Sequence, residues 1–307
     1  MRQIVECVPN FSEGRRPEVV DEIVAAIERV EGVQVLDRSS DADHNRSVIT
    51  FVGPPQAVGE AAFEAMARAA QLIDMDEQQG EHPSMGATDV VPFVPIAGVT
   101  MQDCVQLARR VGARVGEELG IPVYLYEAAA VRPDRVNLGE IRPQSHQYEQ
   151  KKADVGHDER WAPDFGPARV GKAGVTAIGA RAPLIAYNVY LSTGDVTIAE
   201  KIAKAVRYSN GGLRFVKARG FLVEGKAQVS MNLTDFTQTP IYRVVEMIRR
   251  EAAHYGVAVH SSELVGMIPQ QALIDTAVWY LQLGNFEPRL IIENRLGEES
   301  MRRPDYG

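Results

Sequence analysis

The feature that most constrains the fold is one order of segments that the chain contains twice. In the first half, apolar or β-branched runs typical of strands occupy residues 4–8, 33–36, 48–52 and 90–94, and helical patterns occupy residues 17–30 and 54–73. In the second half, strand-like runs occupy residues 184–191, 213–223, 227–233 and 257–260, and helical patterns occupy residues 196–206 and 241–254. Each half therefore has the order strand, helix, strand, strand, helix, strand.

This order is typical of ferredoxin-like units. A chain of 307 residues is also long enough for two domains or for two halves that share a core. Such a sheet leaves one face uncovered unless something packs on it. The sequence therefore predicts an α/β (α+β) fold with two ferredoxin-like βαββαβ-type subdomains, residues 1–178 and 179–307. Their sheets are expected to face each other with the helices outside, and the cleft between them is the expected ligand site.

The first half also contains an expected helix at residues 101–119 and an expected strand at residues 123–126. The next stretch, residues 131–172, is polar, rich in proline and without sustained periodicity, so we interpret it as a connector. A connector of this length is uncommon unless it is functional or partly structured. Ligand contacts are therefore expected within it.

Three glycines, Gly112, Gly116 and Gly120, repeat every four residues along the expected helix 101–119. Glycine has no Cβ, so such a ridge lets another backbone approach closely. Charged residues interleave with these glycines, which favours packing on a sheet in water over packing within a membrane.

Charge and composition exclude several classes of protein. The net charge of −8 disfavours a general nucleic-acid binder, which needs a surplus of Lys and Arg. The two cysteines, Cys7 and Cys104, form no CxxC pair, so neither a disulfide framework nor a zinc site is indicated. No apolar run approaches the length of a membrane span or a signal peptide. We expect a cytoplasmic protein without membrane or nucleic-acid partners.

The strongest local signal is the sequence GEHPSMGATD at residues 80–89, between an expected helix and an expected strand. Pro83 favours an extended backbone at His82, and the glycines at either side permit close approach by a ligand. An imidazole with a pKa near neutrality can both accept and donate a proton. The alternative is a loop histidine that bonds a backbone carbonyl, and spacing alone does not separate the two.

Other chemistries have no support in the sequence. The six histidines form no HExxH or other short-spaced ligand pair, so no metal site is expected. There is no GxSxG sequence, and Cys7 lies in an apolar strand, where a buried, inert thiol is expected. Phosphate-binding sequences of the GxxxxGKS and GxGxxG kinds are also missing.

Two clusters of polar residues lie at the ends of expected strands. Asn10 and Ser12 follow the first strand, while Asp37, Asn45 and Arg46 bracket a polar loop between the second and third strands. These residues are candidates for supporting roles in a site. They have equally simple structural explanations, because Asn10 or Ser12 can cap the helix near residue 17 and Arg46 can pair with Asp37.

A third cluster lies at the end of the connector and mixes an aromatic ring, glycines and two cations, which suits a flat anionic ligand. The alternative is a solvated linker. Its residues are Pro163, Asp164, Phe165, Gly166, Pro167, Ala168, Arg169, Val170, Gly171 and Lys172.

Several long motifs resemble the formiminotransferase family, in the family's order and over nearly the whole chain. They are ECVPNFSEG at residues 6–14, TFVGPP at 50–55, LIDM and GEHPSMGATDVVPFVP within 72–95, PVYLYEAA at 122–129, WAPDFGP at 161–167, LIAYNVYLST at 184–193, SELVGMIP at 262–269 and NRLG at 294–297.

The resemblance implies a one-carbon transferase of histidine degradation. Such an enzyme moves the formimino group of N-formimino-L-glutamate to tetrahydrofolate, its co-substrate, and releases 5-formiminotetrahydrofolate and L-glutamate. It also implies a homodimer in which two α/β subdomains hold the folate between them. No metal is expected, because one imidazole can move the protons that this reaction requires. Animal members continue into a cyclodeaminase domain, for which we expect no room here.

The resemblance also assigns roles to residues. The catalytic acid/base of the family's GEHP motif falls on His82, and its folate-binding stretch falls on residues 163–172, although only 163–167 match well. Glu81 or Asp37 can orient the imidazole, and Arg46, Arg169 or Lys172 can meet substrate carboxylates. Members of the family often carry a second aspartate where this chain has Ser39, so Asp41 or Asp43 is the expected substitute.

Two other functions remain open on the sequence. One is transfer of a formyl group, with formylglutamate or 5-formyltetrahydrofolate as donor, because the residues do not separate formyl from formimino. The other is a non-catalytic folate-binding module, because ferredoxin-like units often serve as ligand-binding domains.

Overall fold

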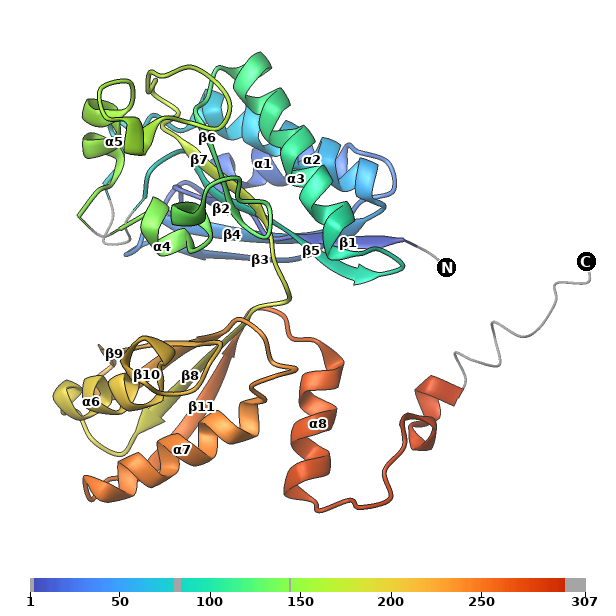
Figure 1. Cartoon of the computed structure of the whole chain (residues 1–307), viewed down its shortest axis with the longest axis vertical. Helices are drawn as coiled ribbons and strands as arrows, with labels where there is room; N and C mark the ends of the chain where they lie inside the picture. Colours follow the sequence, from blue (N-terminus) through green and yellow to red (C-terminus); the bar gives the residue numbers. More distant parts are fainter. Residues whose placement is uncertain (1–2, 80–83, 144, 296–307) are drawn as a thin grey trace, which may run out of the picture. The chain divides into compact units, whose positions relative to one another are not determined.

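A computed structural model describes residues 3–79, 84–143 and 145–295 (Figure 1). The chain divides into two compact units, Met1–Ala182 and Pro183–Gly307. Each has its own core of buried apolar side chains.

The first unit is built on a seven-stranded mixed sheet. From one edge its order is β3, β4, then β1 and β2 end to end, β5, β7 and β6. The pairs among β1 to β5 are antiparallel, whereas β7 runs parallel to both β5 and β6. The strands are β1 (Ile4–Cys7), β2 (Asn10–Phe11), β3 (Gln34–Asp41), β4 (Arg46–Gly53), β5 (Thr88–Ala97), β6 (Val123–Glu127) and β7 (Thr176–Ala180).

Three long helices lie together on one side of this sheet in Figure 1. They are α1 (Pro17–Glu28), α2 (Pro55–Leu72) and α3 (Met101–Arg114), and a π-helical turn, Val115–Leu119, continues α3. Each turns an apolar stripe toward the core, as shown by the buried side chains of Ile23, Met66 and Leu107. Pro17 and Pro55 lie in first turns, where proline costs no hydrogen bond, and Thr100 forms a capping box with Asp103.

The stretch between β6 and β7 is more ordered than the sequence indicates. It contains the short helices α4 (Leu138–Ile141) and α5 (Tyr148–Asp154) and single 3₁₀ turns at Pro133–Arg135 and Glu159–Trp161. Tyr148, Lys151 and Trp161 are buried against the first unit. The stretch interpreted as a connector, residues 131–172, is therefore partly structured, and these side chains anchor it to the core.

The second unit has a four-stranded antiparallel sheet in the order β11, β8, β10, β9. Its strands are β8 (Ile185–Leu191), β9 (Val216–Val223), β10 (Lys226–Leu233) and β11 (Val259–Val265), and its helices are α6 (Val196–Val206), α7 (Ile241–His254) and α8 (Gln270–Tyr280). Glu224 and Gly225 both have positive φ and form the tight β9–β10 turn, as the sequence predicts.

The two units share one order of elements. In each, a βαββαβ run forms four strands in which the first lies between the third and the fourth, giving β5-β1-β4-β3 and β11-β8-β10-β9. The sequence predicted this run in both halves. It did not predict β2, β7 or α8, and it placed the polar loop at residues 37–46, where β3 in fact extends to Asp41 and β4 begins at Arg46.

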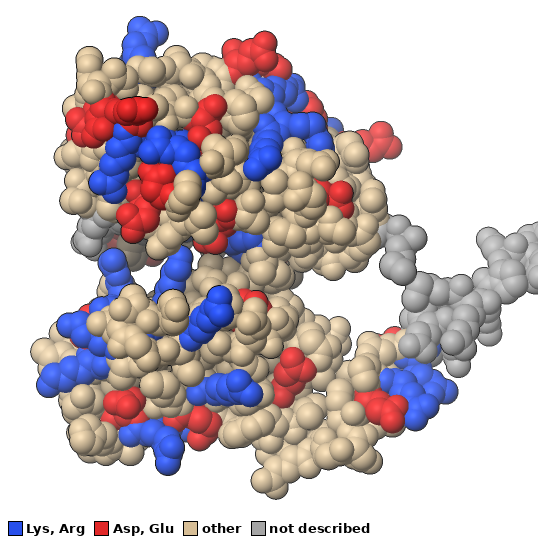
Figure 2. All heavy atoms as spheres, in the orientation of Figure 1, with Lys and Arg blue, Asp and Glu red and all other residues tan. Residues whose placement is uncertain are grey.

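No helix in the described part of the chain has both the length and the apolar character needed to cross a membrane. Figure 2 shows acidic and basic side chains side by side on the face of the first unit that carries α5. This mixture agrees with the many ion pairs on that unit's surface, such as Arg132–Asp134 and Lys152–Asp76.

Candidate functional site

His82, the expected acid/base, and Glu81, one of its expected supporting residues, lie outside the described residues. The chain on either side, up to Gln79 and from Ser84, is described. The contacts that hold these two ends define the surroundings of the candidate site.

On the carboxyl-terminal side, three contacts hold the chain. The Ser84 carbonyl accepts the backbone N–H of Tyr148 at 3.1 Å. The Met85 N–H donates to the Asp89 carboxylate at 2.9 Å, and the Ser12 hydroxyl donates to the Gly86 carbonyl at 2.8 Å. Gly86 is required here, because a Cβ would lie 2.1 Å from the Val175 carbonyl oxygen. The end of this segment is therefore fixed in the first unit's core.

On the amino-terminal side, Asn45 is the anchor. Its amide donates to the Gln79 carbonyl at 2.9 Å, and its side-chain oxygen accepts the Gly14 N–H at 2.9 Å. Asn45 is buried and has a φ of 48°, a left-handed conformation that asparagine tolerates better than most residues. Asn45 was predicted to be a supporting residue, and the structure places it against Gln79, the last described residue before His82.

Asn10 and Arg46 are joined directly, because the Arg46 guanidinium donates to the Asn10 side-chain oxygen. The Asn10 amide in turn donates to the Val8 carbonyl at 3.0 Å. The alternative that Asn10 or Ser12 caps α1 does not hold, because the N-cap is Arg16 and it makes no side-chain cap bond. Glu13 instead accepts the backbone N–H groups of Arg15 and Arg16, at 2.8 and 2.9 Å.

Positive charge gathers at this position. Burial, followed by repulsion from Arg142, lowers the pKa of Arg46 to about 10, while Asp89 and Asp41 oppose this shift. Arg142 forms an ion pair with Asp89, whose side chain is only 4% exposed. Two guanidinium groups thus lie near one buried carboxylate, next to residues that hold the chain on either side of 80–83. Such an arrangement is suited to substrate carboxylates.

Asp37 lies apart from this cluster. It is on β3 opposite Thr50, whereas Asp41 is the residue opposite Arg46 in the strand register. The register therefore places Asp41, one of the two expected substitutes for the missing second aspartate, nearer to Arg46. Ser39 is opposite Val48.

The first half of the expected folate-binding stretch is part of the first unit's framework. The Asp164 carboxylate pairs with Arg135 at 2.5 Å and accepts the Leu125 N–H at 2.7 Å. The Phe165 carbonyl accepts the Val123 N–H at 2.9 Å, which adds this segment to the edge of β6. A Cβ on Gly116 would lie 2.5 Å from the Gly166 backbone nitrogen, so the glycine ridge of the helix packs against this segment.

The second half of the stretch is more accessible. Ala168, Arg169, Gly171 and Lys172 are exposed, and only Val170 is buried. Lys172 forms an ion pair with Asp74, which raises the pKa of the lysine, first through the hydrogen bond and then through charge attraction. Its backbone carbonyl accepts the Met75 N–H at 2.8 Å. Lys172 therefore lies beside the segment that leads from α2 toward Gln79.

Two residues of this environment have no local sequence signal. Tyr148 and Arg142 lie in the stretch that looks like a connector, yet Tyr148 bonds Ser84 and Arg142 bonds Asp89. Only the tertiary fold brings them to the GEHP segment.

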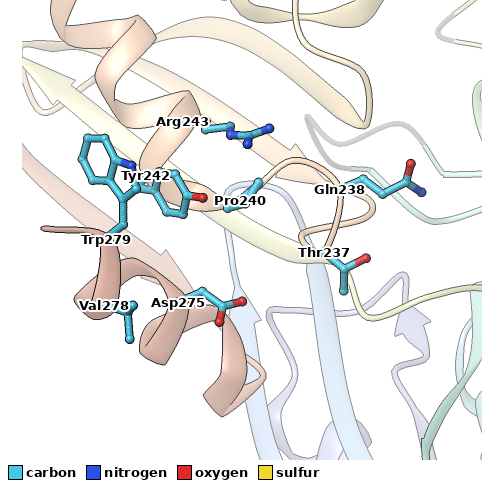
Figure 3. Close-up of a pocket in the computed structure, with 8 residues that line it drawn as sticks. All are labelled: Thr237, Gln238, Pro240, Tyr242, Arg243, Asp275, Val278 and Trp279. Carbon is cyan, nitrogen blue, oxygen red and sulfur yellow. The ribbon is translucent and has the colours of Figure 1, made fainter. Parts of the chain in front are cut away.

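The second unit carries a separate pocket of about 370 Å³, shown in Figure 3. The stacked rings of Tyr242 and Trp279, 4.8 Å apart, form one wall, and Arg243 and Asp275 contribute charges. The remaining lining residues are Thr237, Gln238, Pro240 and Val278. None of the residues singled out from the sequence lines this pocket.

The Cys7 thiol and the possible metal ligands show no sign of a second reactive site among the described residues. Cys7 is fully buried, and burial raises the pKa of its thiol well above the usual value, in agreement with the inert thiol that the sequence predicts. Among residues 3–79, 84–143 and 145–295, no three His, Cys, Asp or Glu side chains gather in a way that could hold a metal ion.

Two family models match this chain over residues 4–181 and 186–296, and both describe the formiminotransferase domain. The first is the model of the formiminotransferase domain, N-terminal subdomain, and the second is the model of the formiminotransferase domain. The glutamate formimidoyltransferase of Thermoplasma acidophilum is 54% identical over 95% of this chain and 97% of its own length. The glutamate formimidoyltransferase of Streptococcus pyogenes serotype M1 is 49% identical over 96% and 99%.

A longer relative matches over only part of its length. The formimidoyltransferase-cyclodeaminase of Mus musculus is 44% identical over 98% of this chain but 58% of its own length. The family models and the two full-length relatives cover both units and the polar cluster around the GEHP segment. The chain therefore belongs to the formiminotransferase family.

Proposed function

We propose that the chain is a glutamate formimidoyltransferase, which moves the formimino group of N-formimino-L-glutamate to tetrahydrofolate and releases 5-formiminotetrahydrofolate and L-glutamate. The observation that carries this proposal is the 54% identity to a relative of that name across almost the full length of both chains. The polar contacts around the GEHP segment support it, because they fix the chain on both sides of the proposed acid/base. This reaction belongs to histidine degradation.

The mechanism needs two proton transfers. An amine nitrogen of tetrahydrofolate attacks the amidine carbon of the donor, and a C–N bond forms as the C=N bond becomes single. The tetrahedral intermediate collapses when the bond to the glutamate nitrogen breaks and the C=N bond of the transferred formimino group forms again. His82 is the proposed acid/base, which takes the proton from the attacking amine and returns it to the departing nitrogen.

The guanidinium groups of Arg46 and Arg142 are suited to binding the carboxylates of the donor. Arg46 lies largely buried beside Asn10, where charge-assisted hydrogen bonds are stronger than in water. We assign to Arg46 a contact with a glutamate carboxylate, and to Asn10 and Asn45 the placement of Arg46 and of Gln79. Asp37 and Glu81 are retained as candidates for orienting the imidazole.

We assign the folate to residues 163–172, with unequal roles along the stretch. Asp164 already satisfies Arg135 and the Leu125 N–H, so its part is to hold the stretch in place. Arg169 and Lys172 are exposed cations suited to the acidic tail of folate. Phe165, half-buried, and the backbone at Gly166, Pro167, Ala168, Val170 and Gly171 supply the remaining surface.

We also propose the arrangement that the family resemblance implies. The expected subdomains, residues 1–178 and 179–307, are both ferredoxin-like, a proposal supported by the shared βαββαβ order and by the two family models. Their boundary lies at Ala182 rather than after residue 178, because residue 178 is within β7. Their sheets face each other around the folate, and two chains form a homodimer. Sedimentation equilibrium should give twice the 33.8 kDa of one chain.

One assay separates this function from its alternatives. The purified chain is mixed with tetrahydrofolate and either formiminoglutamate or formylglutamate, and glutamate release is measured with and without EDTA. Rapid release from formiminoglutamate alone, unchanged by EDTA, is the expected result, because imidazole supplies the proton transfer without a metal. Preference for the formyl donor would assign formyl transfer, and folate binding without release from either donor would assign a binding module.

A further inference from the structure

Tyr148 contacts the chain on both sides of residues 80–83. Its backbone N–H donates to the Ser84 carbonyl at 3.1 Å, and its phenol donates to the Asp76 carboxylate at 2.7 Å. Asp76 precedes the segment by four residues and Ser84 follows it directly. One residue of α5 therefore connects two points on opposite sides of the GEHP histidine in the chain.

The position of Tyr148 is itself firmly set. The residue is 4% exposed, and it begins α5, where the Gln150 side-chain oxygen accepts the Gln147 backbone N–H at 3.1 Å. The Asp76 carboxylate accepts from Lys152 as well, and these two hydrogen bonds, that of Lys152 first, lower its pKa. The phenol is thus a buried donor aimed at a carboxylate that stays ionised near neutral pH.

The exposed ion pair between Lys152 and Asp76 is less suited to holding the chain at Asp76. Both side chains are more than two-fifths exposed, and an exposed ion pair of this kind contributes little to holding a segment. A hydrogen bond from a fixed, buried ring constrains its acceptor more tightly, because the ring has no freedom to follow a moving carboxylate.

We propose that Tyr148 is a positioning residue for the transfer reaction. It holds the chain before His82 through Asp76 and the chain after His82 through Ser84. The inference rests on the proposed function and on His82 as its acid/base. A general acid/base acts only within hydrogen-bond reach of the reacting nitrogen, so a small displacement lowers the rate of the chemical step.

The test is steady-state kinetics of Tyr148→Phe, which keeps the ring and the backbone bond to Ser84 and removes only the bond to Asp76. We expect kcat to fall about 10-fold, while KM for both substrates changes less than about 2-fold. Asp76→Ala should give a similar fall, and the double variant should be no worse than either single variant, because both remove one interaction.

Two matched controls separate positioning from a general effect. Lys152→Met removes the other donor to Asp76, and Tyr280→Phe removes a comparable hydroxyl–carboxylate bond to Glu246, 2.9 Å long, in the second unit. Both should retain kcat within about 2-fold, because each leaves the Tyr148 phenol and the Asp76 carboxylate in place. Melting temperatures of all variants are compared with the parent protein.

The outcomes separate the inference from the function on which it rests. Wild-type kcat in a folded Tyr148→Phe protein, with His82→Ala inactive, would overturn the positioning role and leave the proposed acid/base intact. A loss that appears only in KM, or additive losses in the double variant, would also overturn it. Wild-type activity in His82→Ala would instead reject the acid/base assignment.

Discussion

The guanidinium of Arg135 lies 2.5 Å from the carboxylate of Asp164, and both side chains are more than nine-tenths buried. Arg135 also donates to the Ala162 carbonyl at 2.5 Å, and Asp164 accepts the Leu125 N–H at 2.7 Å. The pair therefore ties the WAPDFGP segment to β6 from the inside, and its charges are satisfied without a ligand.

Replacing Asp164 by Ala should destabilise the protein by about 3–5 kcal/mol, because the Arg135 charge would remain buried without its partner. Urea unfolding of the purified variant measures this. Asp134→Ala, which breaks the exposed pair with Arg132, is the control and should cost less than about 1 kcal/mol. An unchanged unfolding midpoint together with weaker folate binding would show that Asp164 acts on the ligand instead.

Gly116→Ala should destabilise the first unit by about 1–3 kcal/mol, although alanine usually favours a helix over glycine. Its Cβ would lie 2.5 Å from the Gly166 nitrogen and 2.9 Å from the Gly166 Cα, both backbone atoms that have little room to move. Thermal unfolding checks this against Gly171→Ala, where nothing lies within 4 Å of the added Cβ. Equal stability of the two variants would refute the close packing.

Lys151 should make the protein less stable as the pH falls. It is fully buried, its Nζ lies 3.2 Å above the Trp161 ring and 5.0 Å from Tyr124, and it has no hydrogen-bond partner among the described residues. Burial, then repulsion from Arg135 and Arg160, lowers its pKa from 10.5 to about 6, against a weaker attraction by Asp154.

The unfolded chain therefore binds a proton that the folded chain does not, at any pH between about 6 and 10.5. The free energy of unfolding should fall through this window on acidification, by at most about 1.4 kcal/mol per pH unit. The advantage of Lys151→Met over the parent protein should grow from about pH 9 to about pH 6. A pH-independent difference, like that expected for the exposed Lys152→Met, would mean that Lys151 stays charged in its aromatic surroundings.

The regular fold was predictable because its signals are local. Apolar spacing along α6 and α7 gives both helices at the residues observed, and the Glu224–Gly225 turn sets the β9–β10 register. The end of β3 was missed because polar residues such as Asp41 fit an edge strand paired with β4, where pairing outweighs composition. β7 was missed because a run of five buried residues without alternation is too short to recognise.

The site was predictable in part. Asn10, Asn45 and Arg46 were predicted because they lie at the ends of expected strands, and the structure brings them together near the GEHP segment. Asp164 was predicted to contact folate because it lies in the stretch that resembles the family's folate-binding segment. Its partner Arg135 is 29 residues away, so no spacing rule could reveal their ion pair. Tyr148 carried no signal at all, since only tertiary packing places α5 against Ser84.

Charge reversal at Arg169 and Lys172, each to Glu, should weaken folate binding more at low salt than at high salt. Exposed ionic contacts are screened over about 8 Å at physiological ionic strength. Fluorescence titration with tetrahydrofolate at two salt concentrations measures the effect. Arg29→Glu with Arg110→Glu, also exposed, changes the net charge equally and should leave affinity unchanged. Unchanged affinity of the Arg169/Lys172 variant at low salt would place the acidic tail of the folate elsewhere.

The most direct test of the account is the turnover of His82→Ala with formiminoglutamate and tetrahydrofolate. An acid/base contributes mainly as protons move in the transition state, whereas the folate is held by the surrounding residues. We expect a folded variant whose kcat falls by about 10²- to 10⁴-fold, with folate affinity nearly retained and the histidine ionisation lost from the pH–rate profile. A folded His82→Ala protein with near wild-type kcat would contradict it.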